Sequence, residues 1–467
     1  MIRNRPASFT DYYEYTMAQG YFLSNRHLEQ CSFDYFFRSL PFDGGYVVYA
    51  GLADFLEQLK GFTFHEDEIE FFRTKGFHKE FLDYLKTFRF KGTIYSVKEG
   101  EIVFPNEPIL RVEGTIIEAQ IIETLLLNIL NFESLIATKA SRIRQVAGNS
   151  TLLDFGLRRS QGFGGIQASK AAIIGGFDGT SNVHAGLTQG LEVSGTMAHS
   201  WVQSFEDELT AFRTYAGFYP DSTVLLVDTY NTLKSGLPNT ITVAKEMEVK
   251  GHRLKAIRLD SGDLAYLAKN ARKQLDAAGL DYVQISASNQ LDEYVIKSLI
   301  EQKAPIDIFG VGTKLVTAYD DPALDGVYKL GSIDGRPTLK VSENVEKVTM
   351  PGIKKINRYF NEDGSFYADG LSLGSETNME WIEHPLYTKK RVRITGLQSE
   401  ELLHQIVLDG EIIIPLPTAQ ESAKYATLRL DMLNSEHKRF DNPHVYKVGI
   451  DPNLNKLKND LINSNFR

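Results

Sequence analysis

Hydrophobic and polar positions in the first part of the chain alternate between strand and helix patterns. Residues 33–37 predict a strand, and residues 49–59 predict an amphipathic helix with one apolar face. Residues 92–111 hold short apolar runs broken by glycine and proline, which is typical of antiparallel strands and turns. Residues 118–146 carry apolar side chains at helical spacing and predict one long helix. The sequence therefore predicts an α+β domain over residues 1–135.

Between residues 136 and 340, short β-rich runs alternate with helical runs. The clearest strands cover residues 151–155, 223–228, 256–260, 282–286 and 306–309. Helical patterns lie between them, at residues 199–212, 264–278 and 291–302. This βαβα order predicts parallel strands covered by helices. Five clear units, with weaker ones near Asp178 and Glu192, favour a closed (β/α) barrel, and a doubly wound sheet is the structural alternative.

The last part of the chain has another character. Residues 341–358 are charged and rich in turn formers, residues 391–415 hold strand-like pieces, and residues 418–433 look helical. We expect residues 341–467 to form a C-terminal region that packs on the N-terminal domain. No repeat of fixed period and no low-complexity segment interrupts the chain.

Composition limits the class of protein. Of the 467 residues, 42 % are hydrophobic and 24 % charged, as in a globular protein with a large core. A formal net charge of -9 argues against a nucleic-acid partner, which usually needs a basic face. The single cysteine, Cys31, fits a reducing compartment. No signal peptide is recognisable, and the apolar stretches look too short to span a bilayer. We expect a cytoplasmic protein with no membrane partner.

Polar and glycine residues follow the predicted strands at the points where the strands end. In a parallel barrel these points share one rim, where ligands bind. The residues concerned are Arg158, Arg159, Asp178, Thr196, His199, Asp228, Arg258, Asp260, Asp263, Gly310, Gly312 and Thr313. Each has a structural explanation by itself, because an aspartate after a strand commonly caps the next helix and glycine suits any tight turn. Their convergence on one rim is harder to explain without a ligand.

The chemistry of this rim is consistent. Arg158, Arg159 and Arg258 carry the forked donors that bind phosphate or carboxylate. Residues 310–313 can present backbone N–H groups to a monophosphate. Asp178 and the other rim carboxylates (Asp228, Asp260, Asp263) can bind ribose hydroxyls or Mg²⁺. The rim therefore predicts a phosphorylated sugar substrate with a polyanionic leaving group.

Six motifs in order along the chain resemble the nicotinate phosphoribosyltransferase family. They are Thr10-Asp11-Tyr12-Tyr13, Phe155-Gly156-Leu157-Arg158-Arg159, Gly195-Thr196-Met197-Ala198-His199-Ser200, Ile257-Arg258-Leu259-Asp260-Ser261-Gly262-Asp263, Phe309-Gly310-Val311-Gly312-Thr313 and Arg439-Phe440-Asp441-Asn442-Pro443-His444. The resemblance implies an irregular (β/α) barrel of the type II phosphoribosyltransferase kind, with an N-terminal α+β domain and a C-terminal extension. It also implies the substrates nicotinate and 5-phosphoribosyl 1-pyrophosphate, with nicotinate mononucleotide and pyrophosphate as products in NAD salvage.

The same resemblance implies roles for individual residues. His199 is the expected phosphohistidine that couples transfer to ATP hydrolysis, as in an ATP-dependent ligase, with Mg²⁺ as the cofactor. Tyr13, Thr196 and Arg258 are the expected nicotinate contacts, and Thr313 a phosphate contact. Related nicotinamide-specific enzymes carry Phe-Gly-Tyr-Arg where this chain has Phe155 to Arg158, so Phe155 is a candidate to stack on the pyridine ring. Leu157 departs from that relative. Family members commonly form homodimers in which the N-terminal tyrosine enters the partner's site.

Three other functions are weighed against this one. The same fold could act on nicotinamide or quinolinate, which the expected carboxylate pocket disfavours. A phosphate-binding barrel lyase or aldolase would need a Schiff-base lysine inside the barrel, and Lys314 lies beside a phosphate loop instead. A non-catalytic regulator would have lost His199 or Arg258, and both are present.

Overall fold

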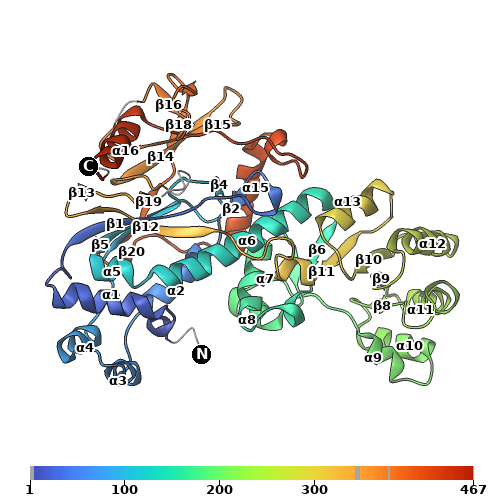
Figure 1. Cartoon of the computed structure of the whole chain (residues 1–467). Helices are drawn as coiled ribbons and strands as arrows, with labels where there is room; N and C mark the ends of the chain where they lie inside the picture. Colours follow the sequence, from blue (N-terminus) through green and yellow to red (C-terminus); the bar gives the residue numbers. More distant parts are fainter. Residues whose placement is uncertain (1–4, 342–347, 377–378, 466–467) are drawn as a thin grey trace. The chain divides into compact units, whose positions relative to one another are not determined.

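The computed structural model describes residues 5–341, 348–376 and 379–465, and its contacts divide the chain into two compact units (Figure 1). Unit 1 comprises residues 1–135 and 323–467, and unit 2 comprises residues 136–322. The sequence prediction extended the middle segment to residue 340, whereas the chain returns to unit 1 at residue 323. Residues 342–347, inside the segment predicted to be turn-rich, lie outside the described residues.

Unit 1 contains a seven-stranded antiparallel sheet in the order β13-β12-β1-β5-β3-β19-β20. Its strands are β1 (Gln30–Phe37), β3 (Thr93–Ser96), β5 (Leu110–Thr115), β12 (Gly326–Ile333), β13 (Arg336–Pro337), β19 (His404–Leu408) and β20 (Glu411–Ile412). A separate pair joins β2 (Val47–Val48) to β4 (Ile102–Val103). Because β1 pairs with β12 and β3 with β19, the N-terminal and C-terminal segments share one sheet.

Six helices of unit 1 come from both ends of the chain. They are α1 (Tyr12–Leu23), α2 (Leu52–Lys60), α3 (Glu66–Thr74), α4 (Lys79–Lys86), α15 (Ala419–Met432) and α16 (Pro452–Asn465). The predicted helix at residues 49–59 corresponds to α2, which buries the apolar face formed by Leu52, Phe55, Leu56 and Leu59. Burial of such a face gives a short helix most of its stability in a folded protein.

The second sheet of unit 1 has six strands, in the order β17-β16-β21-β15-β14-β18. Its strands are β14 (Lys354–Phe360), β15 (Phe366–Leu373), β16 (Trp381–Glu383), β17 (Arg391–Arg393), β18 (Ser399–Glu401) and β21 (Val448–Ile450). Arg358 of β14 is fully buried and pairs with Asp369 and Glu101, each at 2.6 Å. A buried guanidinium needs such partners, because an unpaired charge in the core is strongly destabilising.

The helices α5 (Ile116–Gln120) and α6 (Glu123–Ala147) correct one prediction from the sequence. Residues 116–147 are long and apolar enough, by length and composition, to cross a membrane, with a mean hydropathy of 1.4 in the most apolar window. The expectation that no segment reaches this limit is therefore wrong. Two thirds of that window (67 %) is buried inside the structure, as in the core helix of a globular protein.

Unit 2 is built on six parallel strands in the order β7-β6-β11-β10-β9-β8. They are β6 (Thr151–Asp154), β7 (Gly179–Thr180), β8 (Val224–Leu226), β9 (Ala256–Leu259), β10 (Gln284–Ser288) and β11 (Ile308–Val311). The first strand, β6, pairs with the last, β11, and the edges of the sheet are the second and third strands. This is the cyclic order of a barrel. A doubly wound sheet would not join its first strand to its last.

The barrel is irregular because hydrogen bonding does not close it between β7 and β8 in the described residues. A single bridge from Thr180 to Val193 extends the sheet into this gap. The structure thus confirms the predicted irregular (β/α) barrel.

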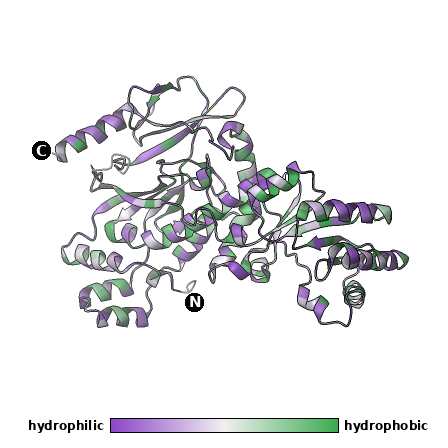
Figure 2. Ribbon diagram, turned by 45° about the vertical axis from the view of Figure 1, so that its right-hand side comes forward, coloured by the Kyte–Doolittle hydropathy of each residue, from purple (hydrophilic) through white to green (hydrophobic). Residues whose placement is uncertain are grey.

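Helices cover the strands of unit 2 (Figures 1 and 2). They are α7 (Gly164–Ile174), α8 (Val183–Gln189), α9 (His199–Gln203), α10 (Glu208–Phe218), α11 (Leu237–Val249), α12 (Leu264–Ala277), α13 (Glu293–Glu301) and α14 (Thr313–Val316). The single helix predicted at residues 199–212 is two helices. Asp207 causes this, because its side chain accepts a hydrogen bond from the Thr210 N–H and begins a new helix at α10.

Candidate active site

Arg258 occupies the centre of the polar cluster at the end of β9. Its Nε donates to the Ser288 hydroxyl at 2.8 Å, its Nη1 donates to Thr196 Oγ1 at 3.0 Å, and its Nη2 donates to Asp260 Oδ1 at 2.7 Å. Three of its five N–H groups thus have protein partners in the described part of the chain. The other two can receive an anionic ligand.

Asp260 is held in its ionised form by this cluster. Burial raises the pKa of its carboxyl. The hydrogen bond from Ser288, the charge and hydrogen bond of Arg258 and the electrostatic influence of the nearby His199 outweigh burial and leave the pKa below its ordinary value. The residue is therefore a carboxylate at neutral pH.

His199 lies at the first position of α9, between two carboxylates. Its Nε2 is 3.7 Å from Asp260 Oδ2 and 4.0 Å from Asp228 Oδ1, and its Nδ1 is 3.1 Å from the Thr229 hydroxyl. The His199 side chain is 40 % exposed, whereas that of Asp228 is 1 % exposed. A partly exposed imidazole with both nitrogens facing polar groups is accessible to a ligand and has a fixed ring orientation.

Asp228 follows β8 and connects the ends of two neighbouring strands. Its Oδ2 accepts hydrogen bonds from the Asp260 N–H at 2.8 Å and from the Ser261 hydroxyl at 2.7 Å. Its Oδ1 is buried without a hydrogen-bond partner in the described residues. A buried carboxylate oxygen of this kind is costly unless a ligand or cation satisfies it.

The ring of Phe155, which follows β6, packs against the backbone of Gly310 in β11. A methyl group on Gly310 would lie 2.4 Å from Cε2 of the Phe155 ring, so only glycine allows the ring this position. The Arg258 guanidinium lies over the same ring, 5.4 Å from its centroid. The structure therefore places an aromatic surface, on which a planar ring can stack, beside a guanidinium that can pair with an anionic group.

Several other predicted residues follow the same strands. Arg158 and Arg159 are exposed on the turn that follows β6. Gly312 and Thr313 follow β11, and a methyl group on Gly312 would lie 3.1 Å from the Phe155 carbonyl oxygen. Asp263 accepts a hydrogen bond from the Tyr266 N–H at 3.0 Å and caps α12.

Asp178 is not part of this site. The residue precedes β7 instead of following it, and it lies level with the middle of β6, where its carboxylate accepts from the Leu152 N–H at 2.8 Å. Arg144 pairs with the same carboxylate at 2.6 Å. The sequence prediction placed Asp178 after the end of a strand, but β7 only begins at Gly179, and the contacts of Asp178 are with Arg144 and the backbone of β6.

Tyr13 belongs to unit 1, at the second position of α1. The residue is 47 % exposed. Burial, followed by the negative charges of Glu123 and Glu14, raises the pKa of its phenol, so it stays neutral.

The sequence interpretation missed Ser288 and Asp154. Ser288 hydrogen-bonds both Arg258 and Asp260, and it ends β10, a strand whose polar end went unnoticed because serine alone is a weak signal. Buried Asp154 accepts from the Gly156 N–H and from the Ser169 and Thr180 hydroxyls, each at 2.8 Å. This set of bonds fixes the turn that carries Phe155.

The cluster fits a metal ion only in part. Among the described residues, no group of three or more His, Cys, Asp or Glu side chains is arranged to hold a metal. Mg²⁺ commonly takes one or two carboxylates together with substrate phosphates and waters. The unpartnered Asp228 Oδ1 and the neighbouring Asp260 Oδ2 fit such an ion when it arrives with a phosphorylated ligand.

Lys314 argues against lyase chemistry. Its ammonium pairs with Asp292 and lies 5.2 Å from the centre of the Tyr319 ring. The hydrogen bond to Asp292 is the largest cause that raises the pKa of this lysine. A Schiff-base lysine needs the opposite shift, since only the neutral amine is a nucleophile.

Comparison with known families matches most of the chain in three segments. A model of the nicotinate phosphoribosyltransferase (NAPRTase) N-terminal domain matches residues 9–131, the NAPRTase family model matches residues 150–366, and the C-terminal domain model matches residues 353–458.

Individual proteins give the same result. Nicotinate phosphoribosyltransferase of Bacillus subtilis (strain 168) is 44 % identical over 454 residues, which cover 94 % of this chain and 92 % of that protein. The mouse enzyme of the same name is 33 % identical, with 97 % and 96 % covered. The crystal structure of human nicotinic acid phosphoribosyltransferase has a TM-score of 0.87 at 32 % identity and covers 97 % of this chain and 99 % of its own. A nicotinate-nucleotide pyrophosphorylase from Pyrococcus furiosus shares the fold, with a TM-score of 0.72 at 24 % identity.

Proposed function

Because this chain belongs to the nicotinate phosphoribosyltransferase family and is a phosphoribosyltransferase of NAD biosynthesis, we propose that it joins nicotinate to 5-phosphoribosyl 1-pyrophosphate and couples this step to ATP hydrolysis through His199. The products are nicotinate mononucleotide and pyrophosphate. The observation that carries the proposal is the Arg258 guanidinium, which three neighbours hold beside the Phe155 ring.

Arg258 supports recognition of the nicotinate carboxylate. The two N–H groups that lack protein partners can donate to a carboxylate, and such charge-assisted bonds are roughly twice as strong as neutral ones. A pyridine ring against Phe155 directs its substituent toward this guanidinium. Nicotinamide offers the same site no negative charge, so Arg258 gives selectivity for the acid over the amide.

Transfer itself requires positioning more than acid–base chemistry. The pyridine nitrogen forms a bond to the anomeric carbon while the bond from that carbon to the pyrophosphate oxygen breaks, and no proton moves. The enzyme therefore needs no general base, and its residues orient the reactants and stabilise charge. Arg158, Arg159 and the Gly310–Thr313 turn are the proposed contacts of the phosphate groups. Mg²⁺ near Asp228 and Asp260 would neutralise the departing pyrophosphate.

His199 is the proposed acceptor of the ATP γ-phosphoryl group. The bond between this phosphorus and the bridging oxygen of ATP breaks as a nitrogen–phosphorus bond forms, ADP leaves, and water later takes the phosphoryl group. The geometry supports this role because the imidazole is accessible and its ring is oriented by Thr229 and Asp260. Neutral imidazole is nucleophilic near neutral pH.

We further propose a cytoplasmic homodimer with shared active sites. The exposed Tyr13 at the start of α1 supports this arrangement, since its ring is available to a second chain. In the dimer it would cover the pyridine ring on the side opposite Phe155.

Radioactive labelling tests the coupling. Wild-type enzyme incubated with γ-labelled ATP should give an acid-labile phosphoprotein, and His199→Asn should give none. The variant should also lose ATP stimulation but keep a slower, ATP-independent transfer, because the ribosyl chemistry does not use the imidazole. His252→Asn, at a half-exposed histidine paired with Asp221, is the matched control and should label like wild type. An unlabelled wild type, or a His199→Asn enzyme with full ATP stimulation, would refute the coupling.

A further inference from the structure

The carboxyl group of Asp154, at the end of β6, accepts hydrogen bonds from three parts of unit 2. Its Oδ1 accepts from the Gly156 N–H, and its Oδ2 accepts from the hydroxyls of Ser169 in α7 and Thr180 in β7, each at 2.8 Å. Asp154, Ser169 and Thr180 are all buried. Burial raises the pKa of the Asp154 carboxyl, and these bonds act against the rise. Each donor therefore offsets part of the cost of burying this group.

Asn182 connects these side chains to a second helix. Its backbone N–H donates to Thr180 Oγ1 at 3.0 Å, and its side-chain amide donates to the Gly165 carbonyl and to Ser169 Oγ, each at 3.2 Å. Its side-chain oxygen accepts from the Ala185 N–H at 3.1 Å and caps α8. Buried side chains therefore join the starts of α7 and α8 to the end of β6. We call Asp154, Ser169, Thr180 and Asn182 the Asp154 network.

The Asp154 network lies where the barrel has few backbone hydrogen bonds. The strand β7 is an edge of the sheet that does not pair with β8 in the described residues, and it consists only of Gly179 and Thr180. Its pairing with β6 is limited to two positions. Side-chain hydrogen bonds therefore supply at this edge the order that strand pairing supplies elsewhere, since a fully satisfied buried network makes its surroundings rigid.

The Asp154 network holds the backbone on both sides of Phe155. Before the ring, the Asp154 carbonyl accepts a hydrogen bond from the Ser181 N–H at 2.8 Å. After the ring, the Gly156 N–H donates to the Asp154 carboxylate. Gly156 is also confined by α14, because a methyl group on it would lie 2.7 Å from Val316 Cβ. The orientation of the Phe155 ring therefore depends on the network as well as on the contacts of the ring itself.

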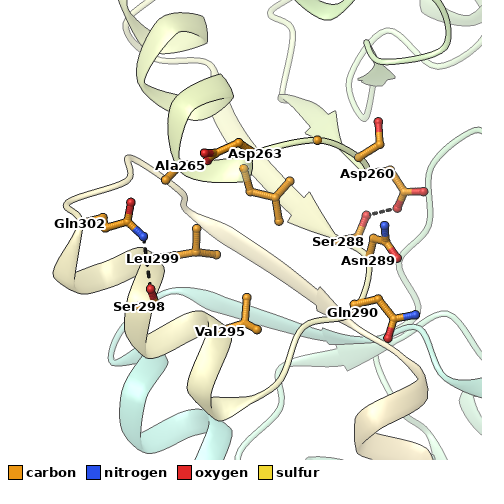
Figure 3. Close-up of a pocket in the computed structure, with 13 residues that line it drawn as sticks. Asp260, Asp263, Ala265, Ser288, Asn289, Gln290, Val295, Ser298, Leu299 and Gln302 are labelled. Carbon is orange, nitrogen blue, oxygen red and sulfur yellow. Dashed lines mark hydrogen bonds between the residues drawn. The ribbon is translucent and has the colours of Figure 1, made fainter.

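A separate set of bonds positions the ends of β9 and β10. There Ser288 donates a hydrogen bond to Asp260 (Figure 3). Within the described residues, no hydrogen bond of Asp154, Ser169 or Thr180 reaches this pair. The turn that carries Phe155 can therefore be perturbed without direct loss of a contact to Asp260.

We propose that Asp154 is a positioning residue for nicotinate, because its network fixes the orientation of the Phe155 ring against the pyridine. The inference rests on the proposed use of nicotinate and adds four buried residues that the six sequence motifs do not contain. The ring contacts the pyridine both before and during transfer. Loss of its orientation should therefore raise KM for nicotinate and leave kcat nearly unchanged, as expected when uniform binding is lost.

Two substitutions at Thr180 separate positioning from stability. Thr180→Val keeps the shape of the side chain and removes the hydroxyl that donates to Asp154. Thr180→Ser keeps the hydroxyl and removes a buried methyl group, which lowers stability by leaving a cavity. Thr115→Val is the matched control in unit 1, because the Thr115 hydroxyl donates to the Glu118 carboxylate at 2.7 Å. Steady-state kinetics with nicotinate and thermal unfolding are measured for each variant.

We expect Thr180→Val, and Ser169→Ala as a second variant, to raise KM for nicotinate about fivefold or more and to change kcat less than about twofold. Thr180→Ser and Thr115→Val should unfold at a lower temperature than wild type and keep the wild-type KM. An unchanged KM in Thr180→Val and Ser169→Ala, or an equal rise in Thr180→Ser, would overturn the positioning role and leave the proposed function standing. A wild type that forms no nicotinate mononucleotide would overturn the proposed function, and this inference with it.

Discussion

Arg258 Nη2 and Asp260 Oδ1 are 2.7 Å apart, two residues from each other at the end of β9. Alternate residues of a strand point to the same face, so this spacing alone brings the cation and the carboxylate together. Ser288 of the neighbouring strand completes the pair by hydrogen-bonding both side chains. The pair positions a guanidinium for an anionic substrate and a carboxylate beside His199.

The first prediction concerns Arg258. Arg258→Ala should reduce kcat/KM for nicotinate by an amount equivalent to about 2–5 kcal/mol. The reason is that the nicotinate carboxylate would then lie in the site without its charged partner. Nicotinamide use should change far less. Arg213→Ala is the control, since Arg213 forms an exposed pair with Glu246. Equal losses of kcat/KM for nicotinate and nicotinamide in Arg258→Ala would show that Arg258 does not recognise the nicotinate carboxylate.

The second prediction concerns the contact between Gly310 and Phe155. Gly310→Ala should displace the Phe155 ring, raise KM for nicotinate and destabilise the fold by about 1–3 kcal/mol, as overpacking usually does. Thermal unfolding and steady-state kinetics measure the two effects. Gly217→Ala should be silent, because a methyl group there meets nothing within 4 Å. A wild-type KM for nicotinate in Gly310→Ala would show that Phe155 is not part of the substrate site.

The third prediction concerns pH and Glu14. Burial is the largest cause that raises the pKa of Glu14 to about 7, from an ordinary value of 4.5. The unfolded chain therefore loses this proton at lower pH than the folded chain, and stability falls as pH rises from 4.5 through 7.

Glu14→Gln removes that pH-dependent loss. The variant should be about 2–3 kcal/mol more stable than wild type at pH 8 and no more stable at pH 4.5, as seen in thermal unfolding at the two pH values. Glu80→Gln, at an exposed position of α4, is the control and should follow wild type. A Glu14→Gln gain of the same size at both pH values would contradict an ionisable group as its source.

The fourth prediction concerns assembly. If Tyr13 completes the partner's site, Tyr13→Ala and His199→Asn chains should each lack ATP-stimulated activity, and their mixture should recover about a quarter of the wild-type value through hybrid dimers with one intact site. Tyr12→Ala, a neighbour of similar exposure, should stay active alone. No recovery in verified hybrid dimers would exclude a shared site.

The barrel was predictable because its strands carry dense apolar runs with polar ends, and the order of the elements along the chain confirmed the family resemblance. The strands β9 and β11 lie within two residues of the predicted ranges. Arg258, Asp260, His199 and Asp228 meet as expected, since Arg258 lies in β9, Asp228 and Asp260 follow the neighbouring parallel strands β8 and β9, and His199 begins α9 beside both carboxylates.

Other features depend on contacts between distant residues. Asp178 was misplaced because a two-residue strand such as β7 has no detectable periodicity, so the start of the strand was taken for its end. Ser288 was missed because a serine indicates a functional site only through its contact with Arg258, which lies thirty residues earlier in the sequence. The return of residues 323–340 to unit 1 depends on the pairing of β12 with β1, which the local pattern of residues 326–333 does not reveal.

The central claim is that the enzyme selects nicotinate. The most direct measurement is a competition in one reaction that contains equal concentrations of nicotinate and nicotinamide, phosphoribosyl pyrophosphate, ATP and Mg²⁺, with both mononucleotides quantified by mass spectrometry. The geometry of Arg258 predicts nicotinate mononucleotide almost alone, with its excess over nicotinamide mononucleotide lost in Arg258→Ala. Comparable amounts of the two products from the wild-type enzyme would contradict the account.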